Sequence, residues 1–425
     1  MHRALLGGFL MTLAWWSFLG RPAPAVPMPL QEPAGPTLSA SGQAVAAATN
    51  RFAHDLYRQL SQEPGNHFFA PASINTALAL AYGGARGTTA EEMAQVLHFG
   101  RLGAEVHTGF RDLAAFLPTV AQPTRKPPVL SVANALWCQD GFPLQTDYLQ
   151  LTNLNYAAGL RRLDIANDPD KARRTINAWV EEQTRDKIKE LLKSGQVTAD
   201  TRLVLTNAIY MKATWLRPFE PDRTGKEDFA VTAERKVSVP MMRQTTHFRY
   251  GATDDAQIVE LPYEGGSLSM VVVLPRQKNG LADLEKKLAQ QPEWLGNQFG
   301  TLNLAKVNLK LPKFKARSSF ELSRTLGAMG MRQAFLPNGA DFSGITTSEP
   351  LFIGLVVHQA FVAVDEEGTE AAAATAITMR AGSAARPETI HDFHADHPFL
   401  YFIRDVRSGA ILFMGRLSAP EADAR

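Results

Sequence analysis

Cysteine is nearly absent from this sequence, since Cys138 is the only one among 425 residues. A single cysteine cannot form an intramolecular disulfide, so a small scaffold held by disulfides is excluded. Apolar packing must hold the fold, and a chain of this length with 45% hydrophobic residues can bury a sizeable core. Cys138 stands beside Trp137 after an apolar run, which predicts a buried and unreactive thiol.

A strong excess of charge is also missing, because 44 Lys plus Arg face 42 Asp plus Glu and give a formal net charge of +2. The densest basic spots are the pairs Arg161-Arg162 and Arg173-Arg174, and short pairs of this kind are typical of solvated surfaces. We therefore expect no nucleic-acid partner.

The sequence lacks the motifs of the common enzyme classes. No Gly-x-Ser-x-Gly elbow is present, and the nearest match, Gly265–Ser269, lacks the closing glycine and lies at a predicted hairpin turn. There is no His-Glu-x-x-His zinc motif, no phosphate-binding Gly-x-x-x-x-Gly-Lys and no dinucleotide fingerprint. An enzyme is therefore a distant alternative, and no cofactor is expected.

One cluster has metal-binding chemistry, because segment His391–His397 holds three histidines and two aspartates. In an extended strand His391 and His397 share one face, while His394 points to the other. This alternation favours a surface strand over a metal site.

The first 42 residues differ from the rest of the chain. Met1–Arg3 is short and basic, Ala4–Gly20 is uncharged and mostly apolar, and Ala23–Ala25 is small. This order predicts a secretory signal peptide cut after Ala25. An uncleaved anchor is the alternative, because the apolar run is nearly long enough to span a bilayer. Residues 26–42 are rich in Pro, Ala, Gly and Ser and are expected to form a disordered lead-in.

The leader predicts that the mature protein is secreted, either outside the cell or into a periplasm. No Asn-x-Ser/Thr acceptor for glycosylation occurs in the sequence, which favours a bacterial export route. No further stretch is long and apolar enough to span a bilayer, so we expect no membrane contact after signal removal.

Helical patterns recur through the remainder of the chain. Apolar residues return every three to four positions from Gln43 to Leu60, which predicts an amphipathic helix. Asp168-Pro169 is typical of a helix start. An apolar face continues from there to Leu192, and Gly195 is the expected stop.

Strand signals are at least as strong as the helical ones. Val307, Leu309 and Leu311 alternate with polar residues, as in a strand with one buried face. Apolar runs bounded by polar or turn residues predict further strands at 203–205, 270–274, 361–364 and 399–403. Because helices and strands mix without a regular βαβ order, we predict an α+β fold with a large mixed or antiparallel sheet.

The segment Gly368–Ser383 suits two different environments. It consists mainly of small residues, and no proline occurs before Pro387. Its two charges, on Glu370 and Arg380, fall on one face of an extended strand, while the opposite face is small or apolar and can be buried. The segment can therefore be an exposed loop or a buried strand about 40 Å long. The alternative is an alanine-rich loop without a function.

The start of this segment, Glu366–Thr375, resembles the hinge of inhibitory members of the serpin family throughout its length. Motifs similar to those of the same family follow in the expected order from about Gln43 to Pro420. They are Phe69–Ile74, Asn134–Trp137, Ile176–Val180, Leu205–Tyr210, Pro312–Phe314, Ala340–Ile345, His397–Phe399 and Phe413–Arg416. Each motif is weak by itself, but their ordered sum is specific.

The resemblance implies a single domain over residues 43–420, followed by a short tail at 421–425. It implies an α+β fold with three β-sheets, eight or nine helices and an exposed reactive-centre loop, in a metastable native state. It also implies a monomeric inhibitor rather than an enzyme. In such an inhibitor a serine protease cleaves the loop and forms an acyl-enzyme, and loop insertion into the central sheet then traps the protease.

The resemblance assigns roles to particular residues as well. Trp215 resembles the breach residue, where insertion begins. Ser73, Asn207 and His358 resemble the shutter, a hydrogen-bonded group beneath the strands that part. The hinge residues are Glu367, Gly368, Thr369, Glu370, Ala371, Ala372, Ala373, Ala374 and Thr375.

The usual loop length of the family places the reactive bond at Gly382-Ser383, which suits elastase-like or subtilisin-like proteases with small primary pockets. The alternative bond, Arg380-Ala381, would suit trypsin-like proteases and would shorten the inserting strand. Two other functions stay open. One is a non-inhibitory serpin that acts as chaperone or carrier, and the other is a cross-class inhibitor of cysteine proteases.

Overall fold

The computed structural model describes residues 37–124, 126–157, 159–369 and 388–420. All of them belong to one compact unit, residues 35–425. The expected signal peptide, most of the lead-in, the tail, hinge residues 370–375 and both candidate reactive bonds lie outside the described residues. None of the described helices combines the length and the hydrophobicity that a bilayer span needs.

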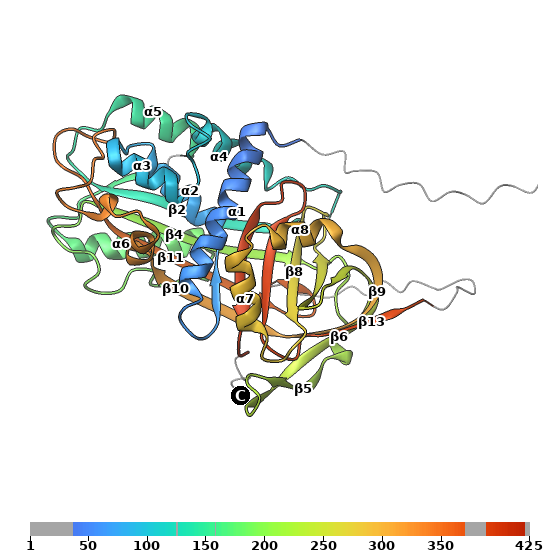
Figure 1. Ribbon diagram of the computed structural model, residues 1–425. Helices are drawn as coiled ribbons and strands as arrows, with labels where there is room; N and C mark the ends of the chain where they lie inside the picture. The colour runs from blue at the N-terminus through green and yellow to red at the C-terminus, as the bar shows by residue number, and fades with distance from the viewer. Residues whose placement is uncertain (1–36, 125, 158, 370–387, 421–425) are drawn as a thin grey trace, which may run out of the picture. The chain divides into compact units, whose positions relative to one another are not determined.

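Nine α-helices occur in the described ranges, in agreement with the expected eight or nine. Figure 1 shows how they are arranged around the sheets. They are α1 Ala40–Leu60, α2 Pro71–Tyr82, α3 Gly87–Val96, α4 Glu105–Phe116, α5 Thr146–Asn155, α6 Pro169–Gln183, α7 Leu281–Gln290, α8 Trp294–Thr301 and α9 Ser323–Met329. Two short 3-10 helices, η1 Pro221–Arg223 and η2 Gln333–Phe335, accompany them.

The start of α1 differs from the prediction. The helix begins at Ala40 instead of Gln43, because Ser39 caps it by accepting a hydrogen bond from the Gly42 amide at 3.1 Å. Residues 40–42 are therefore helical, and the prediction of a disordered lead-in is wrong for them.

The end of α6 also differs from the prediction. Asp168 caps its start as expected, by accepting a hydrogen bond from the Lys171 amide at 2.9 Å. The helix then ends at Gln183, well before Gly195. Arg185 and Asp186 adopt left-handed backbone conformations with φ of 54° and 62°, which a continuing helix does not allow.

The strands form one six-stranded and one nine-stranded sheet. They are β1 His67–Phe69, β2 Val129–Gln139, β3 Leu160–Leu163, β4 Leu203–Thr214, β5 Gly225–Ala230, β6 Lys236–Ala252, β7 Ala256–Pro262, β8 Leu268–Pro275, β9 Asn303–Pro312, β10 Phe314–Glu321, β11 Ile353–Val364, β12 Gly368–Thr369, β13 Ile390–His394, β14 Phe399–Asp405 and β15 Ile411–Leu417. The long strand β6 runs through two parts of the larger sheet. Most of its length, with β5, β9 and β13, makes a small third sheet, so the predicted three sheets and the α+β class are confirmed.

All the strands predicted from apolar runs are present, in β4, β8, β11 and β14. In β9 the side chains of Val307, Leu309 and Leu311 are buried and their neighbours are more exposed, as the alternation predicts. The histidine segment departs from the prediction, because its strand β13 ends at His394 and His397 beyond it is buried. In the described part of the chain no three potential metal ligands gather.

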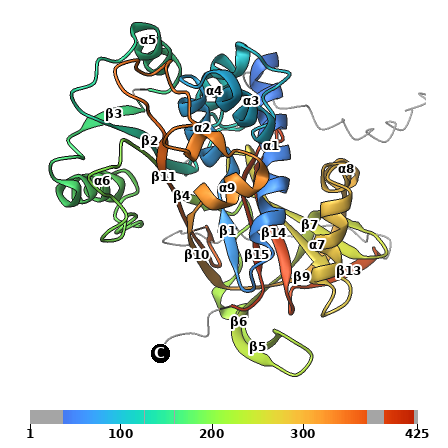
Figure 2. The same ribbon diagram turned by 60° about the vertical axis from the view of Figure 1, so that its left-hand side comes forward.

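The six-stranded sheet separates two apolar clusters, because successive side chains of a strand point to opposite faces. In β2, Leu136 and Cys138 enter the main core, which also contains apolar residues of α1 and α2. Ala135 and Trp137 enter a smaller cluster with Ile176 of α6. Figure 2 lets the reader follow α2 and α6 around β2 and β4. The Cys138 thiol is buried as predicted, and this burial raises its pKa to about 11.

Candidate functional site

The centre of the six-stranded sheet is a pair of parallel strands that are joined along most of their length. Residues 353–361 of β11 pair with residues 203–210 of β4. At one end a third strand, β12, stands between them. Gly368 pairs with Thr214 of β4, and Thr369 pairs with Ala213 of β4 on one side and with Val364 of β11 on the other. Two hinge residues are thus already part of the sheet.

A tight turn between β11 and β12 reverses the chain so that β12 runs antiparallel to both neighbours. The Asp365 carboxylate accepts hydrogen bonds from the amides of Glu367 and Gly368 at 3.0 and 3.2 Å. The Asp365 amide donates to the Gly368 carbonyl at 3.0 Å. An aspartate side chain that accepts a hydrogen bond from the amide two residues further on is a common way to stabilise such a turn.

Gly368 passes so close to β4 that no side chain fits there. A Cβ atom at this position would lie 2.0 Å from the Ala213 carbonyl oxygen and 2.8 Å from Thr214 Cα. Its φ of 154° is also rarely adopted by residues with a side chain. Glycine is therefore required for β12 to enter between β4 and β11.

We predict that Gly368→Ala pushes β12 out of the sheet or destabilises the fold by about 1–3 kcal/mol, since backbone atoms of β4 cannot move aside cheaply. Gly225→Ala is the matched control, because a Cβ at Gly225 meets no atom within 4 Å. Urea unfolding of both variants tests this. Equal midpoints for the two would contradict the close approach.

Thr369 is held by an aromatic pair, at the place where the resemblance to serpins puts the breach. Thr369 is fully buried, and its hydroxyl lies 2.6 Å from the Tyr263 hydroxyl, within hydrogen-bond distance. The Tyr263 ring stacks on Trp215, with ring centroids 4.5 Å apart and planes 10° apart. Trp215 in turn donates to the turn, from Nε1 to the Asp365 carbonyl at 3.0 Å and from its amide to the Glu367 carbonyl at 2.8 Å.

Glu366 fastens the turn from a second side. Its carboxylate pairs with Lys313 at 2.7 Å and accepts a hydrogen bond from the Thr224 hydroxyl at 2.8 Å. Its carbonyl accepts a hydrogen bond from the Phe219 amide at 2.7 Å. Burial opposes ionisation of Glu366, but these two partners hold its pKa below the usual range.

A second polar group lies beneath the paired part of β4 and β11. Asn207 Nδ2 donates to Ser73 Oγ at 2.7 Å and to Asn134 Oδ1 at 2.5 Å. Ser73 Oγ donates to Asn134 Oδ1 at 2.8 Å. His358 Nδ1 hydrogen-bonds to Asn207 Oδ1. The group therefore ties α2, β2, β4 and β11 together.

The protonation of His358 follows from its partners. The Ala70 amide can only donate, and it lies 3.2 Å from His358 Nε2, so Nε2 accepts and the proton sits on Nδ1. His358 is fully buried, and the loss of water lowers the pKa of its imidazole to about 3. His358 is therefore neutral in the folded protein at ordinary pH.

This burial predicts a loss of stability in mild acid. Below the unfolded pKa of 6.5 the unfolded chain takes up a proton at His358, whereas the folded chain does so only near pH 3. The full contribution is therefore present above pH 6.5 and falls as the pH drops toward 3, by up to about 1.4 kcal/mol per pH unit.

Urea unfolding between pH 7 and pH 4, about the window that this linkage sets, measures the effect. We expect His358→Gln to flatten the fall in stability relative to the wild type. Ser73→Ala is the control, since it weakens the same group without removing a titrating side chain. A His358→Gln variant with the wild-type pH slope would show that His358 is not the source.

The structure brings together the residues that the family resemblance assigned to the shutter, and it places the residue assigned to the breach against the hinge. Ser73, Asn207 and His358 meet in one network, and Trp215 contacts the hinge. Two members were missed. Asn134 completes the polar group, although it stands in the core motif Asn134–Trp137 already noted in the sequence. Tyr263 carries the contact to Thr369, and only its place just before the glycine turn hints at a role.

The comparisons with known proteins agree with this architecture. Residues 47–420 match the family described as Serpin (serine protease inhibitor). A serpin-like protein of Thermococcus kodakarensis is 43% identical over 377 residues, which cover 89% of this chain and 86% of that protein. The leukocyte elastase inhibitor of Bos taurus is 41% identical over 386 residues, which cover 88% of this chain and 99% of that protein.

Solved structures show the same fold. The crystal structure of Serpin48, described as a highly specific serpin in the insect Tenebrio molitor, aligns with a TM-score of 0.77 at 34% sequence identity. The alignment covers 89% of this chain and 98% of that one.

Proposed function

The chain belongs to the serpin family, and we propose that it is an irreversible suicide-substrate inhibitor of serine endopeptidases rather than an enzyme. The observation that carries this proposal is β12, since Gly368 and Thr369 already form the start of a strand between β4 and β11. A hinge in this position can continue inward once the loop is cut. The rest of the hinge consists of small residues that a sheet interior accepts.

The proposed reaction begins as ordinary acyl transfer. The protease serine Oγ attacks the carbonyl carbon of Gly382, the peptide bond to Ser383 breaks, and the Ser383 amine leaves with a proton. The loop is then an ester of the protease, and its two ends are free to separate. Trapping requires that insertion outruns hydrolysis of this ester.

Insertion exchanges one ladder for two. The parallel pairing between β4 and β11 over residues 203–210 and 353–361 must open, and the inserted strand then pairs antiparallel with both, as β12 already does. The new ladders are more numerous, and antiparallel pairing is slightly stronger per residue than parallel pairing. The hydrogen bond from His358 to Asn207 joins the two parting strands, so it resists opening until the loop is cut.

Side chains along a strand point alternately to its two faces, and this alternation indicates where the rest of the hinge would lie after insertion. Thr369 faces Tyr263 in the main core, so Ala371 and Ala373 would follow into the same layer after insertion. Glu370 would face the opposite side. The small residues on the core side would enter without steric conflict.

The favoured targets are elastase-like or subtilisin-like proteases, which bind small residues before the cut bond. The proposed bond Gly382-Ser383 offers such a residue. The bovine relative is a leukocyte elastase inhibitor, which supports the elastase-like choice. Cleavage at Arg380-Ala381 would instead direct the chain to trypsin-like proteases.

A protease panel tests this function. The purified chain is incubated with elastase, subtilisin, chymotrypsin and trypsin, followed by denaturing gels and N-terminal sequencing of the released peptide. We expect a covalent complex at the summed mass and a new N-terminus at Ser383. An N-terminus at Ala381 would keep the trap and move the specificity. Cleavage without any complex would favour a non-inhibitory serpin instead.

We also propose that the chain is exported through its apolar leader and acts as a secreted monomer. The basic start, the apolar run and Ala23–Ala25 support this proposal. N-terminal sequencing of protein secreted by an expressing cell should begin at Val26. Retention in the membrane fraction with an intact N-terminus would show an anchor instead.

A further inference from the structure

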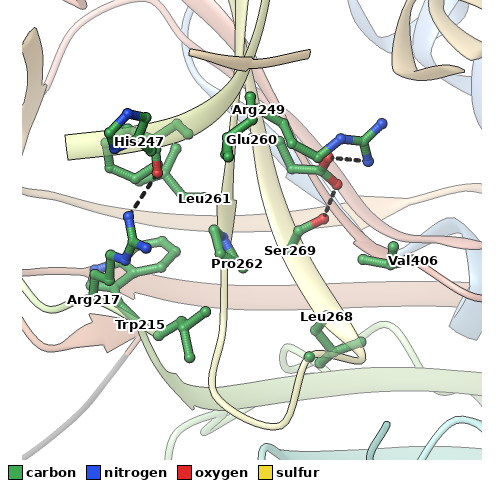
Figure 3. Close-up of a pocket in the computed structure, with 14 residues that line it drawn as sticks. Trp215, Arg217, His247, Arg249, Glu260, Leu261, Pro262, Leu268, Ser269 and Val406 are labelled. Atoms are coloured by element: carbon green, nitrogen blue, oxygen red, sulfur yellow. Dashed lines mark hydrogen bonds and ion pairs between the residues drawn. The ribbon is translucent and has the colours of Figure 1, made fainter. Parts of the chain in front are cut away.

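A cavity of about 250 Å³ lies beside Trp215, the residue that holds the hinge (Figure 3). Its walls come from the segment after β4, from β6 and β7, from the turn into β8 and from the start of β9. Three exposed large apolar residues gather around it: Leu216, Leu304 and Val406 are 49%, 69% and 37% exposed. Apolar side chains left in water around a hollow indicate a place for a ligand.

The carboxylate in this cavity is already satisfied. Glu260 is 3% exposed, and its oxygens accept hydrogen bonds from Ser269 Oγ at 2.6 Å and from Arg249 and Arg404 at 2.9 Å each. Figure 3 shows the hydrogen bonds that link Arg249 to Glu260 and Glu260 to Ser269. One carboxylate thus faces two guanidinium groups. Among the described residues that line the cavity, Glu260 is the one carboxylate, whereas Arg217 and Arg249 are both cations. The lining therefore offers no free anion to a cationic ligand and carries an excess of positive charge.

Arg217 at the rim donates only to uncharged groups in the described part of the chain. Its Nη1 donates to the Thr246 hydroxyl at 2.8 Å and to the His247 carbonyl at 2.9 Å. Among the described residues no carboxylate pairs with it. The neighbouring His247 imidazole lies 2.8 Å from the Glu388 carboxylate and has its own partner. The Arg217 guanidinium is therefore available to pair with an anion that enters the cavity.

We propose that this cavity binds a small amphipathic carboxylate. The apolar body lies among Leu216, Leu304 and Leu268, and the carboxylate pairs with the Arg217 guanidinium, which suits two parallel hydrogen bonds. A volume of about 250 Å³ is below the ~300–1,000 Å³ typical of sites for drug-sized molecules. The ligand body is therefore the size of a fused pair of aromatic rings rather than a long acyl chain.

The cavity is placed to act on the hinge. Trp215 lines it and also stacks on Tyr263, which lies against the Thr369 hydroxyl. A ligand against Trp215 stabilises the arrangement that holds β12, so ligand binding and hinge insertion influence each other. This part of the inference rests on the proposed function, whereas binding itself does not.

Calorimetric titration with naphthalene-2-carboxylate tests binding, with the neutral naphthalene-2-carboxamide as the matched probe. We expect the carboxylate to bind at least tenfold more tightly than the amide. Arg217→Gln should remove that difference, and Arg223→Gln, an exposed arginine outside the cavity, should preserve it. Absence of binding, or equal affinities of wild type and Arg217→Gln for the carboxylate, would overturn the site.

The coupling is measured with a protease that the chain traps. Saturating naphthalene-2-carboxylate should change the number of inhibitor molecules consumed per trapped protease at least twofold in the wild type and not in Arg217→Gln. If saturating ligand leaves this number unchanged in the wild type, the proposed coupling is overturned. If no protease is trapped at all, the proposed function fails, while the calorimetric result still decides the site.

Discussion

We expect Thr369→Arg to convert the proposed inhibitor into a substrate that proteases cut and release. Thr369 is fully buried between β4 and β11, with its hydroxyl against Tyr263. An arginine there must either bury an unpaired charge, at several kcal/mol, or keep the hinge outside the sheet. Because insertion competes with hydrolysis of the acyl-enzyme, a barrier raised by only about 1.4 kcal/mol slows trapping tenfold.

The measurement is the number of inhibitor molecules consumed per protease trapped, with cleaved and covalently bound chain separated on denaturing gels. We expect this number to rise tenfold or more in Thr369→Arg. Thr369→Ser is the matched control, since it keeps a small side chain and the hydroxyl. Its number of inhibitor molecules consumed per trapped protease should remain within about twofold of the wild-type number. An unchanged number for Thr369→Arg would show that insertion does not start at this residue.

Local patterns in the sequence were sufficient to predict many of the helices and strands of the fold. The strands in β4, β8, β9, β11 and β14 follow from apolar runs or alternation, which depend only on neighbours along the chain. The cap at Asp168 followed in the same way, but the end of α6 did not. Arg185 and Asp186 adopt left-handed backbone conformations. Aspartate is only a weak signal for such a conformation, and the apolar pattern that continues to Leu192 outweighed it in the prediction.

The candidate site was predictable only where a family resemblance supplied the residues. The roles of Asn134 and Tyr263 were not predicted, because they depend on partners far away in the sequence. These partners are Asn207 for Asn134 and Thr369 for Tyr263. The entry of β12 escaped as well, since it depends on how β4 and β11 are spaced and aligned. The cavity beside Trp215 draws its walls from several elements and has no contiguous motif.

A disulfide between β4 and β11 should abolish trapping reversibly, because the inserted strand needs these two strands to separate. Ala208 and Gln359 are register partners. The preceding pair, Asn207 and His358, hydrogen-bond to each other, so Ala208 and Gln359 share the opposite face and lie away from the polar group. Cys138 pairs with Leu203 in the sheet and is not a neighbour of this pair.

The double variant Ala208→Cys with Gln359→Cys therefore tests the central claim, that the cut loop enters between β4 and β11. Mass spectrometry verifies the crosslink, and each single variant controls for the loss of the native side chain. With the disulfide intact, the target protease should cut the chain without forming a covalent complex, whereas a portion of the same preparation that is reduced before the protease is added should form the complex. A covalent complex formed equally well before and after reduction would contradict insertion between these strands.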